Sequence, residues 1–168
     1  IAEKVVGHVE NGTTDQAADI LKVPTSDYTS NERWSVEMEN IFQTLPLMLA
    51  LSIEMPNPGD YKSIEVTGIP ILITRDKNNN VNAFRNVCSH RGAIIAQEGI
   101  GNRSRFSCPY HGWTYSNTGD LIGVTDKSKF GDIDNKCFGL EKLQCKELAG
   151  LIFVSLSRNE DVDFEKFL

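Results

Sequence analysis

The sequence predicts a mainly β protein with a helical arm at its N-terminus, and three observations support this. From Pro56 onward the chain consists of short segments rich in β-branched residues, separated by turns that contain Gly, Pro and Asn. Before that point, apolar side chains recur at helical spacing. Two stretches that contain Cys and His, 88–92 and 108–113, lie in expected loops of the β region. We therefore expect an antiparallel β sandwich or barrel over residues 56–160, preceded by an arm over residues 1–55.

The arm is predicted to contain three helices. Residues 2–9 have apolar side chains at helical spacing, and Asn11-Gly12 is typical of a left-handed helix stop. Thr13-x-x-Gln16 is a capping box for a second short helix that reaches Leu21. Thr29-x-x-Glu32 predicts a longer helix, with an apolar face that extends to Leu45.

The β region divides into strands at its turn signals. A polar hairpin turn is expected at 76–80, a turn at 99–102 and a tight joint at 149–150. Residues 125–138 are highly charged and are interpreted most simply as a solvated loop. The expected strands are 61–66, 69–74, 81–86, 103–107, 113–115, 121–124, 140–148 and 151–156.

Length and composition limit the classes of partner. A chain of 168 residues that is 40% hydrophobic is long enough to bury one core. Its net charge of -6 argues against nucleic acid or an anionic membrane as a partner, because both favour a basic surface. The longest apolar run, 45–53, is too short to span a bilayer, and the N-terminus lacks the pattern of a signal peptide. We therefore expect a cytoplasmic protein with protein partners.

The two ends of the chain suggest a fragment of a longer protein. The sequence starts with Ile1 rather than Met. Its last stretch, 161–168, is apolar and acidic, and is similar to the opening of another element. We interpret it as the start of a linker to a missing C-terminal domain.

Four metal-donor side chains stand in the stretches Cys88-Ser89-His90-Arg91-Gly92 and Cys108-Pro109-Tyr110-His111-Gly112-Trp113. Each stretch offers one thiolate and one imidazole. Two soft sulfur ligands suit an iron that stays ferric, and two neutral imidazoles suit the iron that takes the electron. The donor set therefore fits a [2Fe-2S] cluster in which one iron is ligated by histidine.

Zinc is the alternative for the same donors. Structural zinc also takes two cysteines and two histidines, although its modules usually pair like with like, as Cys-x-x-Cys and His-x3-His. A disulfide framework is disfavoured, because four cysteines in 168 residues is ordinary and no secretion signal accompanies them. Cys137 and Cys145 lie outside the two stretches, and we expect them to be free or packing thiols.

The pattern Cys-x-His-Arg-Gly, then Cys-x-x-His-Gly-Trp-x-Tyr, then Gly-x-Leu resembles the N-terminal Rieske domain of the α subunit of ring-hydroxylating Rieske non-haem iron oxygenases. The helical arm, the Pro-x-Pro-Gly-Asp-Tyr segment at 56–61 and the closing 150–154 are similar to the same family, whereas 45–51 lacks a tryptophan-containing segment that many relatives carry. The matching residues are Cys88, His90, Arg91, Gly92, Cys108, Pro109, Tyr110, His111, Gly112, Trp113, Tyr115, Gly119 and Leu121.

The resemblance implies an oxidoreductase, a Rieske-type mono- or dioxygenase. In such enzymes the [2Fe-2S] cluster relays single electrons from a ferredoxin or flavin reductase to a mononuclear non-haem iron. That iron lies in a C-terminal domain of the same or a neighbouring subunit of a trimer, where it activates O2 to hydroxylate an organic, often aromatic, substrate. Here Cys88 and Cys108 would hold the iron that stays ferric, and His90 and His111 the iron that is reduced.

The chain cannot supply the mononuclear iron site by itself. A facial triad needs two histidines and a carboxylate. The chain has three histidines, and once the loops use two of them, only His8 remains. The implied iron therefore belongs to the missing C-terminal domain.

Other loop residues have expected supporting roles. Gly92 and Gly112 would let backbone N–H groups approach the cluster sulfur, and Tyr115 could add a hydroxyl as a hydrogen-bond donor. Arg91 and Trp113 are candidates either for a docking surface or for local packing of the loops. A free-standing Rieske-type ferredoxin is the alternative function. The long arm and these loop residues favour the oxygenase.

Overall fold

The computed structural model describes residues 1–157 and 162–168. The chain divides by its contacts into two compact units, an arm unit (residues 1–34) and a β unit (residues 35–168). The domain boundary predicted between residues 55 and 56 stays a prediction. The one predicted between residues 160 and 161 lies outside the described residues.

The arm unit contains α1 (Ala2–Asn11), α2 (Ser26–Thr29) and the start of α3 (Asn31–Glu37). α1 ends where predicted, at Gly12, which adopts a left-handed conformation. The N–H of Gly12 bonds the carbonyls of His8 and Val9, which have no partner further along the helix. Within the described residues, no helix combines the length and apolar content that a membrane span requires.

The prediction of a second helix at 13–21 was wrong, because these residues form no helix. The Thr13 hydroxyl, which should cap this helix, lies 2.9 Å from Nδ1 of His8. Gln16 donates to the Thr14 hydroxyl at 3.3 Å instead of reaching back to the cap. Both halves of the capping box are therefore engaged elsewhere.

The long helix predicted at 29–45 forms as α3 and continues as η1, a π-helical segment over Met38–Phe42. The Ser30 hydroxyl accepts from the Arg33 N–H at 3.2 Å, which places the start slightly later than predicted. Residues 47–51, which were assigned to the helical arm, instead form a strand, β1. The reason is a long-range one: β1 pairs with a strand more than 100 residues later, and pairing at that distance leaves no local sequence signal.

The β unit has three antiparallel sheets within the described residues, which confirms the predicted fold class. The central sheet has the order β5-β2-β3-β4-β9, a second sheet the order β1-β11-β10, and a third the order β6-β7-β8. The strands are β1 (Leu47–Leu51), β2 (Asp60–Val66), β3 (Ile69–Arg75), β4 (Val81–Arg85), β5 (Gly99–Asn102), β6 (Arg105–Ser107), β7 (Thr114–Ser116), β8 (Leu121–Gly123), β9 (Lys142–Leu143), β10 (Cys145–Leu148) and β11 (Leu151–Val154). Short helical turns are η2 (Ser52–Glu54), η3 (Lys127–Phe130), η4 (Asn135–Cys137) and α4 (Phe164–Phe167).

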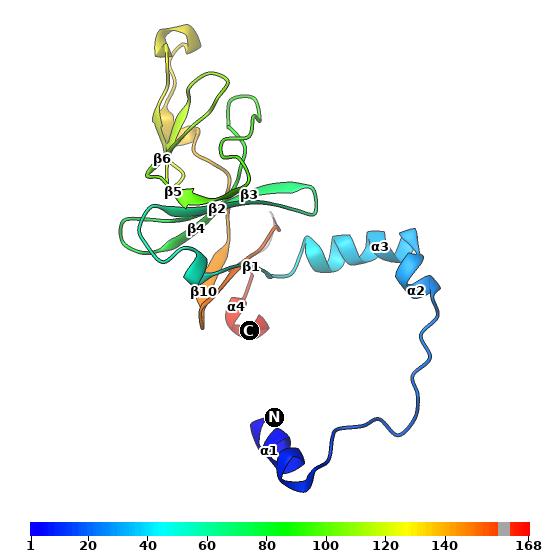
Figure 1. Ribbon diagram of the computed structural model, residues 1–168. Coiled ribbons are helices and arrows are strands. Elements are labelled where there is room, and N and C mark those ends of the chain that lie inside the picture. The colour runs from blue at the N-terminus through cyan, green and yellow to red at the C-terminus, as the bar shows by residue number, and fades with distance from the viewer. Residues whose placement is uncertain (158–161) are drawn as a thin grey trace. The chain divides into compact units, whose positions relative to one another are not determined.

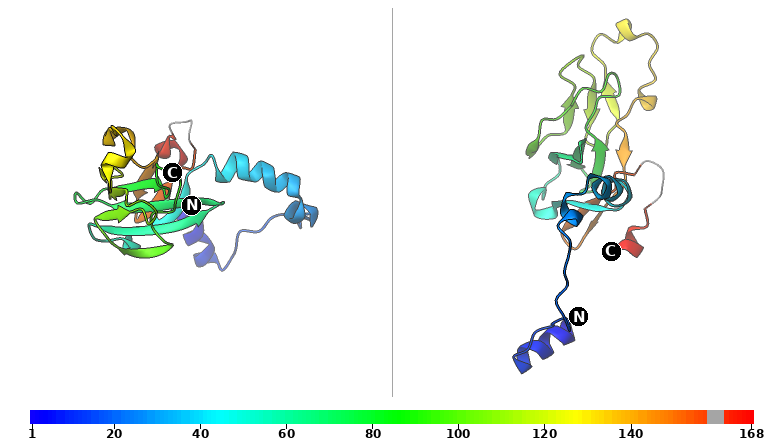
Figure 2. Two further views of the ribbon diagram at one scale, coloured as in Figure 1. Left: turned by 90° about the horizontal axis from the view of Figure 1, so that it is seen from above. Right: turned by 90° about the vertical axis from the view of Figure 1, so that its right-hand side faces the viewer.

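The central sheet has a hydrophobic core on each face. Along β3, Leu72 belongs to the core that contains the two loop cysteines, whereas Ile71 and Ile73 belong to the core beneath β1 and β11. Successive residues of a strand point to opposite faces of the sheet. Because a core covers each face, all three side chains are fully buried. Figure 1 and the right-hand view of Figure 2 show the β6–β8 sheet beyond one side of the central sheet and β1 and β10 beyond the other.

One loop prediction in the β region was wrong, and a second was incomplete. Residues 99–102, expected as a turn, form the edge strand β5, which pairs with the otherwise open side of β2. The excursion at 125–138, interpreted as a solvated loop, buries Ile133 in the core of the loop cysteines and packs Phe130 against that core. Its charged residues dominate the local pattern and conceal these two apolar contacts.

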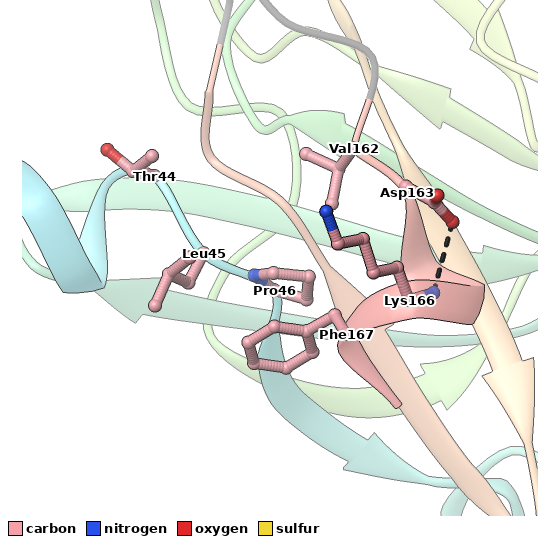
Figure 3. A pocket seen from close by; sticks show the side chains of 7 residues that line it. All are labelled: Thr44, Leu45, Pro46, Val162, Asp163, Lys166 and Phe167. Carbon is pink, nitrogen blue, oxygen red and sulfur yellow. Dashed lines mark hydrogen bonds between the residues drawn. The ribbon is translucent and has the colours of Figure 1, made fainter.

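The end of the described chain lies against the connection into β1. Lys166 N–H donates to the Asp163 carboxylate at 3.1 Å, which caps α4. A pocket of about 340 Å³ separates this segment from Thr44, Leu45 and Pro46 (Figure 3). Because α4 and the β6–β8 sheet lie at opposite ends of the β unit (Figure 1), this pocket is separate from the loops that carry the metal donors.

A buried arginine joins the central sheet to the β1-β11-β10 sheet. The side chain of Arg75 is 4% exposed and forms two hydrogen bonds with the Glu147 carboxylate, at 2.7 and 3.0 Å. It also donates to the carbonyls of Met55 and Asn79. These bonds satisfy the buried guanidinium and lower the pKa of Glu147.

Replacing Glu147 by glutamine should destabilise the protein at neutral pH and have less effect in acid. Because the pKa of Glu147 is lowered in the folded state, its contribution is complete above the unfolded pKa of about 4.3 and is lost as pH falls through the folded pKa. We expect a loss of about 1–2 kcal/mol near pH 7, measured by urea unfolding, that shrinks toward pH 3.

Glu165→Gln is the matched control for this prediction. Its carboxylate pairs with Lys146 but is 79% exposed, so its removal should change the free energy of unfolding by less than about 0.5 kcal/mol. A destabilisation by Glu147→Gln that is the same at both pH values would contradict the assignment.

Candidate metal centre

The two stretches that carry the metal donors form loops of the same construction. Loop 1 (residues 86–95) follows β4, and loop 2 (residues 108–113) joins β6 to β7. In each loop, the N–H of the cysteine donates to the carbonyl of the residue five positions later. The glycine four positions after the cysteine donates its N–H to the carbonyl of that cysteine. The bonds are Cys88 N–Ala93 O (2.8 Å), Gly92 N–Cys88 O (2.8 Å), Cys108 N–Trp113 O (2.7 Å) and Gly112 N–Cys108 O (3.0 Å).

Both glycines hold the turn of their loop. Gly92 and Gly112 have φ of 70° and 64°, in the left-handed region that other residues rarely adopt. Their own N–H groups bond the cysteine carbonyls of their loops, and the approach of other backbone N–H groups to cluster sulfur stays a prediction. Each glycine therefore shapes its loop so that a cysteine and a histidine emerge from it.

The two loop cysteines are buried in one core. Cys88 is 3% and Cys108 is 4% exposed, and both are free thiols. Burial raises the pKa of Cys88, a hydrogen bond with Tyr115 opposes this, and the neighbouring Cys108 adds to the increase. Two adjacent buried thiols would become thiolates only with a positive charge between them, and a bound metal supplies that charge.

The two histidines lie beside each other. Their ring centroids are 4.7 Å apart, with 67° between the ring planes. Burial and the nearby His111 and Arg91 lower the pKa of His90, which favours the neutral ring that a metal requires. Nδ1 of His111 is buried and has no hydrogen-bond partner among the described residues, so this atom is available as a ligand.

The donors therefore stand as a pair of thiols and a pair of imidazoles. Within the described residues, no three His, Cys, Asp or Glu side chains gather around a point that could hold a single metal ion. A [2Fe-2S] cluster of the Rieske type takes its donors in two pairs, one on each iron. The chemistry of the donors and the unpartnered Nδ1 of His111 fit that group.

Tyr115 connects loop 1 to the β6–β8 sheet. Its hydroxyl lies 3.2 Å from Cys88 Sγ and accepts from the Ser89 N–H at 3.1 Å. The side chain is fully buried, and burial raises its pKa far above the ordinary value. The hydroxyl therefore keeps its proton and can donate a hydrogen bond to a Cys88 thiolate.

Trp113 and Arg91 differ sharply in exposure. Trp113 is 2% exposed, and its ring stacks on His90 with centroids 5.0 Å apart and 11° between the planes. Of the two interpretations weighed for Trp113, its burial supports packing behind the loops. Arg91 is exposed beside His90 and stays a candidate for docking.

Three residues near the donors were missed by the sequence interpretation. The ring of Phe130 meets His90 edge to face at 5.2 Å. Ser89 donates to the carbonyl of Gly139 at 2.6 Å, and Thr125 donates to that of Gly112 at 3.3 Å. The apolar spacing of Phe130 and Ile133 within a charged stretch was the available signal.

Comparison with a family model places most of the β unit in a known family. Residues 46–144 match the Rieske [2Fe-2S] domain. This range includes both loops, all four donors, and the segment from 125 to 139 that packs against them.

Individual relatives are larger oxygenases. The chain is 34% identical to the large subunit of anthranilate 1,2-dioxygenase from Burkholderia cepacia, over 92% of this chain and 40% of that protein. Among solved structures, it matches naphthalene 1,2-dioxygenase from Rhodococcus sp., bound to indole, with a TM-score of 0.78 and 32% identity, over 97% of this chain and 36% of that one. It also matches a quaternary ammonium Rieske monooxygenase studied for carnitine oxidation and inter-subunit electron transfer, with a TM-score of 0.76 and 30% identity, over 86% of this chain and 40% of that one. The chain thus spans less than half the length of each.

Proposed function

Because the chain belongs to the Rieske [2Fe-2S] domain family, we propose that it is the electron-relaying part of the large subunit of a terminal oxygenase. The observation that carries this proposal is the pair of buried cysteines beside the pair of adjacent histidines, on two loops of the same construction. When bound, the cluster accepts and releases one electron at a time. Cys88, His90, Cys108 and His111 are the proposed ligands.

The oxygenase is favoured over a free-standing ferredoxin by the extent of the matches. The aligned region covers 97% of the chain in the naphthalene dioxygenase structure, so it includes arm residues as well as the β unit. The matched proteins include both dioxygenases and a monooxygenase, and the number of oxygen atoms transferred is left open.

The proposed partners follow from that role. A ferredoxin or flavin reductase would donate electrons, and a mononuclear iron domain of the same or a neighbouring subunit, in a trimer, would accept them. The substrate would be an organic molecule, and an aromatic one by analogy with the two dioxygenases. The cytoplasmic location stays a prediction from the sequence.

The coding sequence after Leu168 tests the proposal directly. An open frame that continues into a His-x4-His segment would support the oxygenase, and a stop codon at that point would contradict it and favour the carrier. The full-length product should then consume O2 when supplied with NADH, a reductase system and substrate. Its Cys108→Ser variant should not.

Replacing Tyr115 by phenylalanine should lower the midpoint potential of the bound cluster, on the order of 50 mV. The hydroxyl lies 3.2 Å from Cys88 Sγ. It would donate to a cluster-bound thiolate, which has no proton, and this bond would strengthen when the sulfur gains electron density on reduction. A differential bond strength of about 1 kcal/mol corresponds to that shift for a single electron. A dye-mediated redox titration followed by visible circular dichroism measures it.

Tyr110→Phe is the matched control for Tyr115→Phe. Tyr110 is 61% exposed and lies directly beside His111, with ring centroids 3.8 Å apart. Its variant removes the same hydroxyl group from a position outside the core, so the potential should be unchanged. Equal shifts in the two variants, or none for Tyr115→Phe, would rule out the proposed role of the Tyr115 hydroxyl.

A further inference from the structure

A segment that follows the Cys and His motif in the sequence forms hydrogen bonds to both donor loops. Residues 124–139, here called the strap, contain η3 and η4 and extend beyond the β6–β8 sheet (Figure 1). Most of the strap is exposed, but Ile133 is buried and Val124 and Phe130 are partly buried against the core of the loop cysteines. The strap is therefore anchored to the part of the core that holds the metal donors.

The first end of the strap is attached to loop 2. The Thr125 hydroxyl donates to the Gly112 carbonyl at 3.3 Å. A Cβ atom placed on Gly112 would lie 2.3 Å from Thr125 Oγ1, so the two residues are in direct contact. Gly112 follows His111, and this contact therefore fixes the strap at loop 2.

The other end of the strap is attached to loop 1. The Ser89 hydroxyl donates to the Gly139 carbonyl at 2.6 Å. Ser89 lies between Cys88 and His90, and its N–H is already held by Tyr115. The two ends of the strap thus connect one donor loop to the other through hydroxyl-to-carbonyl hydrogen bonds.

Between these two attachments, Phe130 contacts the histidine pair. Its ring meets His90 at 5.2 Å with 85° between the planes, and meets Trp113 at 5.7 Å with 74°. Trp113 also stacks on His90. The partly exposed His90 ring therefore lies between an indole on its face and a phenyl ring at its edge, which is an arrangement that orients an imidazole and covers part of it with apolar atoms.

His111 has different surroundings. Phe130 is more distant from it, at 6.4 Å, and its nearest aromatic neighbour is the exposed Tyr110. A cavity of about 390 Å³ opens beside it, lined by Tyr110, His111, Gly112, Thr125, Asp126, Lys129 and Phe130. The strap thus places Phe130 nearer to His90 than to His111 and leaves a cavity beside His111.

We propose that the strap positions His90: its attachments through Thr125 and Gly139 hold Phe130 against the imidazole, and this contact sets the potential and the lifetime of the bound cluster. The proposal rests on cluster binding, and not on the identity of the electron partners. Phe130 is a positioning residue, because it touches a ligand rather than the proposed cluster.

The direction of the effect follows from charge. With two thiolates and two neutral imidazoles, the oxidised cluster has no net charge, and the reduced cluster carries one negative charge. A water-excluding ring at His90 disfavours the charged, reduced form. Removing that ring should therefore raise the midpoint potential and open a path for chelators.

The test compares Phe130→Ala with Phe138→Ala in protein that holds the cluster. Phe138 is on the same strap and is 37% exposed, but packs its ring on Trp113, at 5.6 Å. For Phe130→Ala we expect a positive shift of the midpoint potential, altered EPR g-values and cluster loss to a chelator about tenfold faster. Phe138→Ala should keep the wild-type potential and g-values, and Phe130→Leu should restore most of the chelator resistance.

Thr125→Val provides a second, milder test that leaves every aromatic ring in place. It removes the hydroxyl that bonds Gly112 while keeping the bulk of the side chain. We expect a smaller shift of the potential in the same direction. Wild-type values of the potential and the chelator rate for Phe130→Ala, or equal changes for Phe138→Ala, would overturn the proposal. Both readouts are independent of any reductase or catalytic domain, so they separate this inference from the proposed oxygenase function.

Discussion

Replacing Cys108 by serine should abolish cluster binding, with iron and sulfide falling from about two of each per chain to near zero. Cys108 is one of two buried thiols that face each other in the core. A serine hydroxyl is a poor ligand for iron and does not ionise at neutral pH, so one iron would lose half of its protein donors. Iron and sulfide analysis with visible absorption measures the loss.

His111→Ala should have the same result from the other pair of donors. It removes the ring whose buried Nδ1 has no hydrogen-bond partner in the part of the chain that the structure describes. Because the binding free energy of a metal group stabilises the folded protein, both variants should also unfold at lower denaturant concentration than the loaded wild type.

Cys137→Ser is the control for the two ligand variants. Cys137 is an exposed thiol on η4, outside both loops. It should retain full iron, sulfide and absorption. A Cys108→Ser or His111→Ala protein with full iron and unchanged absorption would overturn the ligand assignment.

Replacing Gly112 by alanine should destabilise the protein far more than replacing Gly92. The two glycines have equivalent places in loops of the same construction and similar positive φ values. An alanine at Gly92 would meet open space, so only the backbone strain of about 1–2 kcal/mol applies. An alanine at Gly112 would also overlap Thr125, which raises the expected loss to about 3–4 kcal/mol. Urea unfolding of the cluster-free proteins measures both losses.

The double variant Gly112→Ala/Thr125→Ala separates the two causes. It keeps the backbone strain but removes Thr125 Oγ1, the nearest atom to the added methyl group. Part of the lost stability should therefore return. Equal destabilisation by Gly92→Ala and Gly112→Ala would show that the contact with Thr125 has no energetic weight.

The strands of the β unit could be predicted from sequence because each one has a local pattern. β2, β3 and β4 are rich in β-branched residues and end at turns, and the joint at Ala149-Gly150 forms with both residues at positive φ, as a tight hairpin requires. The four proposed ligands were selected in the same way, since Cys and His at short spacing indicate a candidate site without knowledge of the fold.

What could not be predicted depends on contacts between distant residues. The Thr13 hydroxyl bonds His8 instead of capping a helix, and residues 99–102 become a strand because β2 offers an open edge. Phe130 stands among charged residues, and its position against His90 depends on how the strap is attached to both loops. Local propensity does not encode these contacts.

The most direct test of the central claim is an EPR spectrum of the dithionite-reduced protein, with iron, sulfide and zinc quantified in the same sample. The account predicts the rhombic signal of a histidine-ligated [2Fe-2S] cluster, with about two irons and two sulfides per chain. A silent spectrum with about one zinc per chain would contradict it, because Cys88, His90, Cys108 and His111 would then hold a structural ion and carry no electrons.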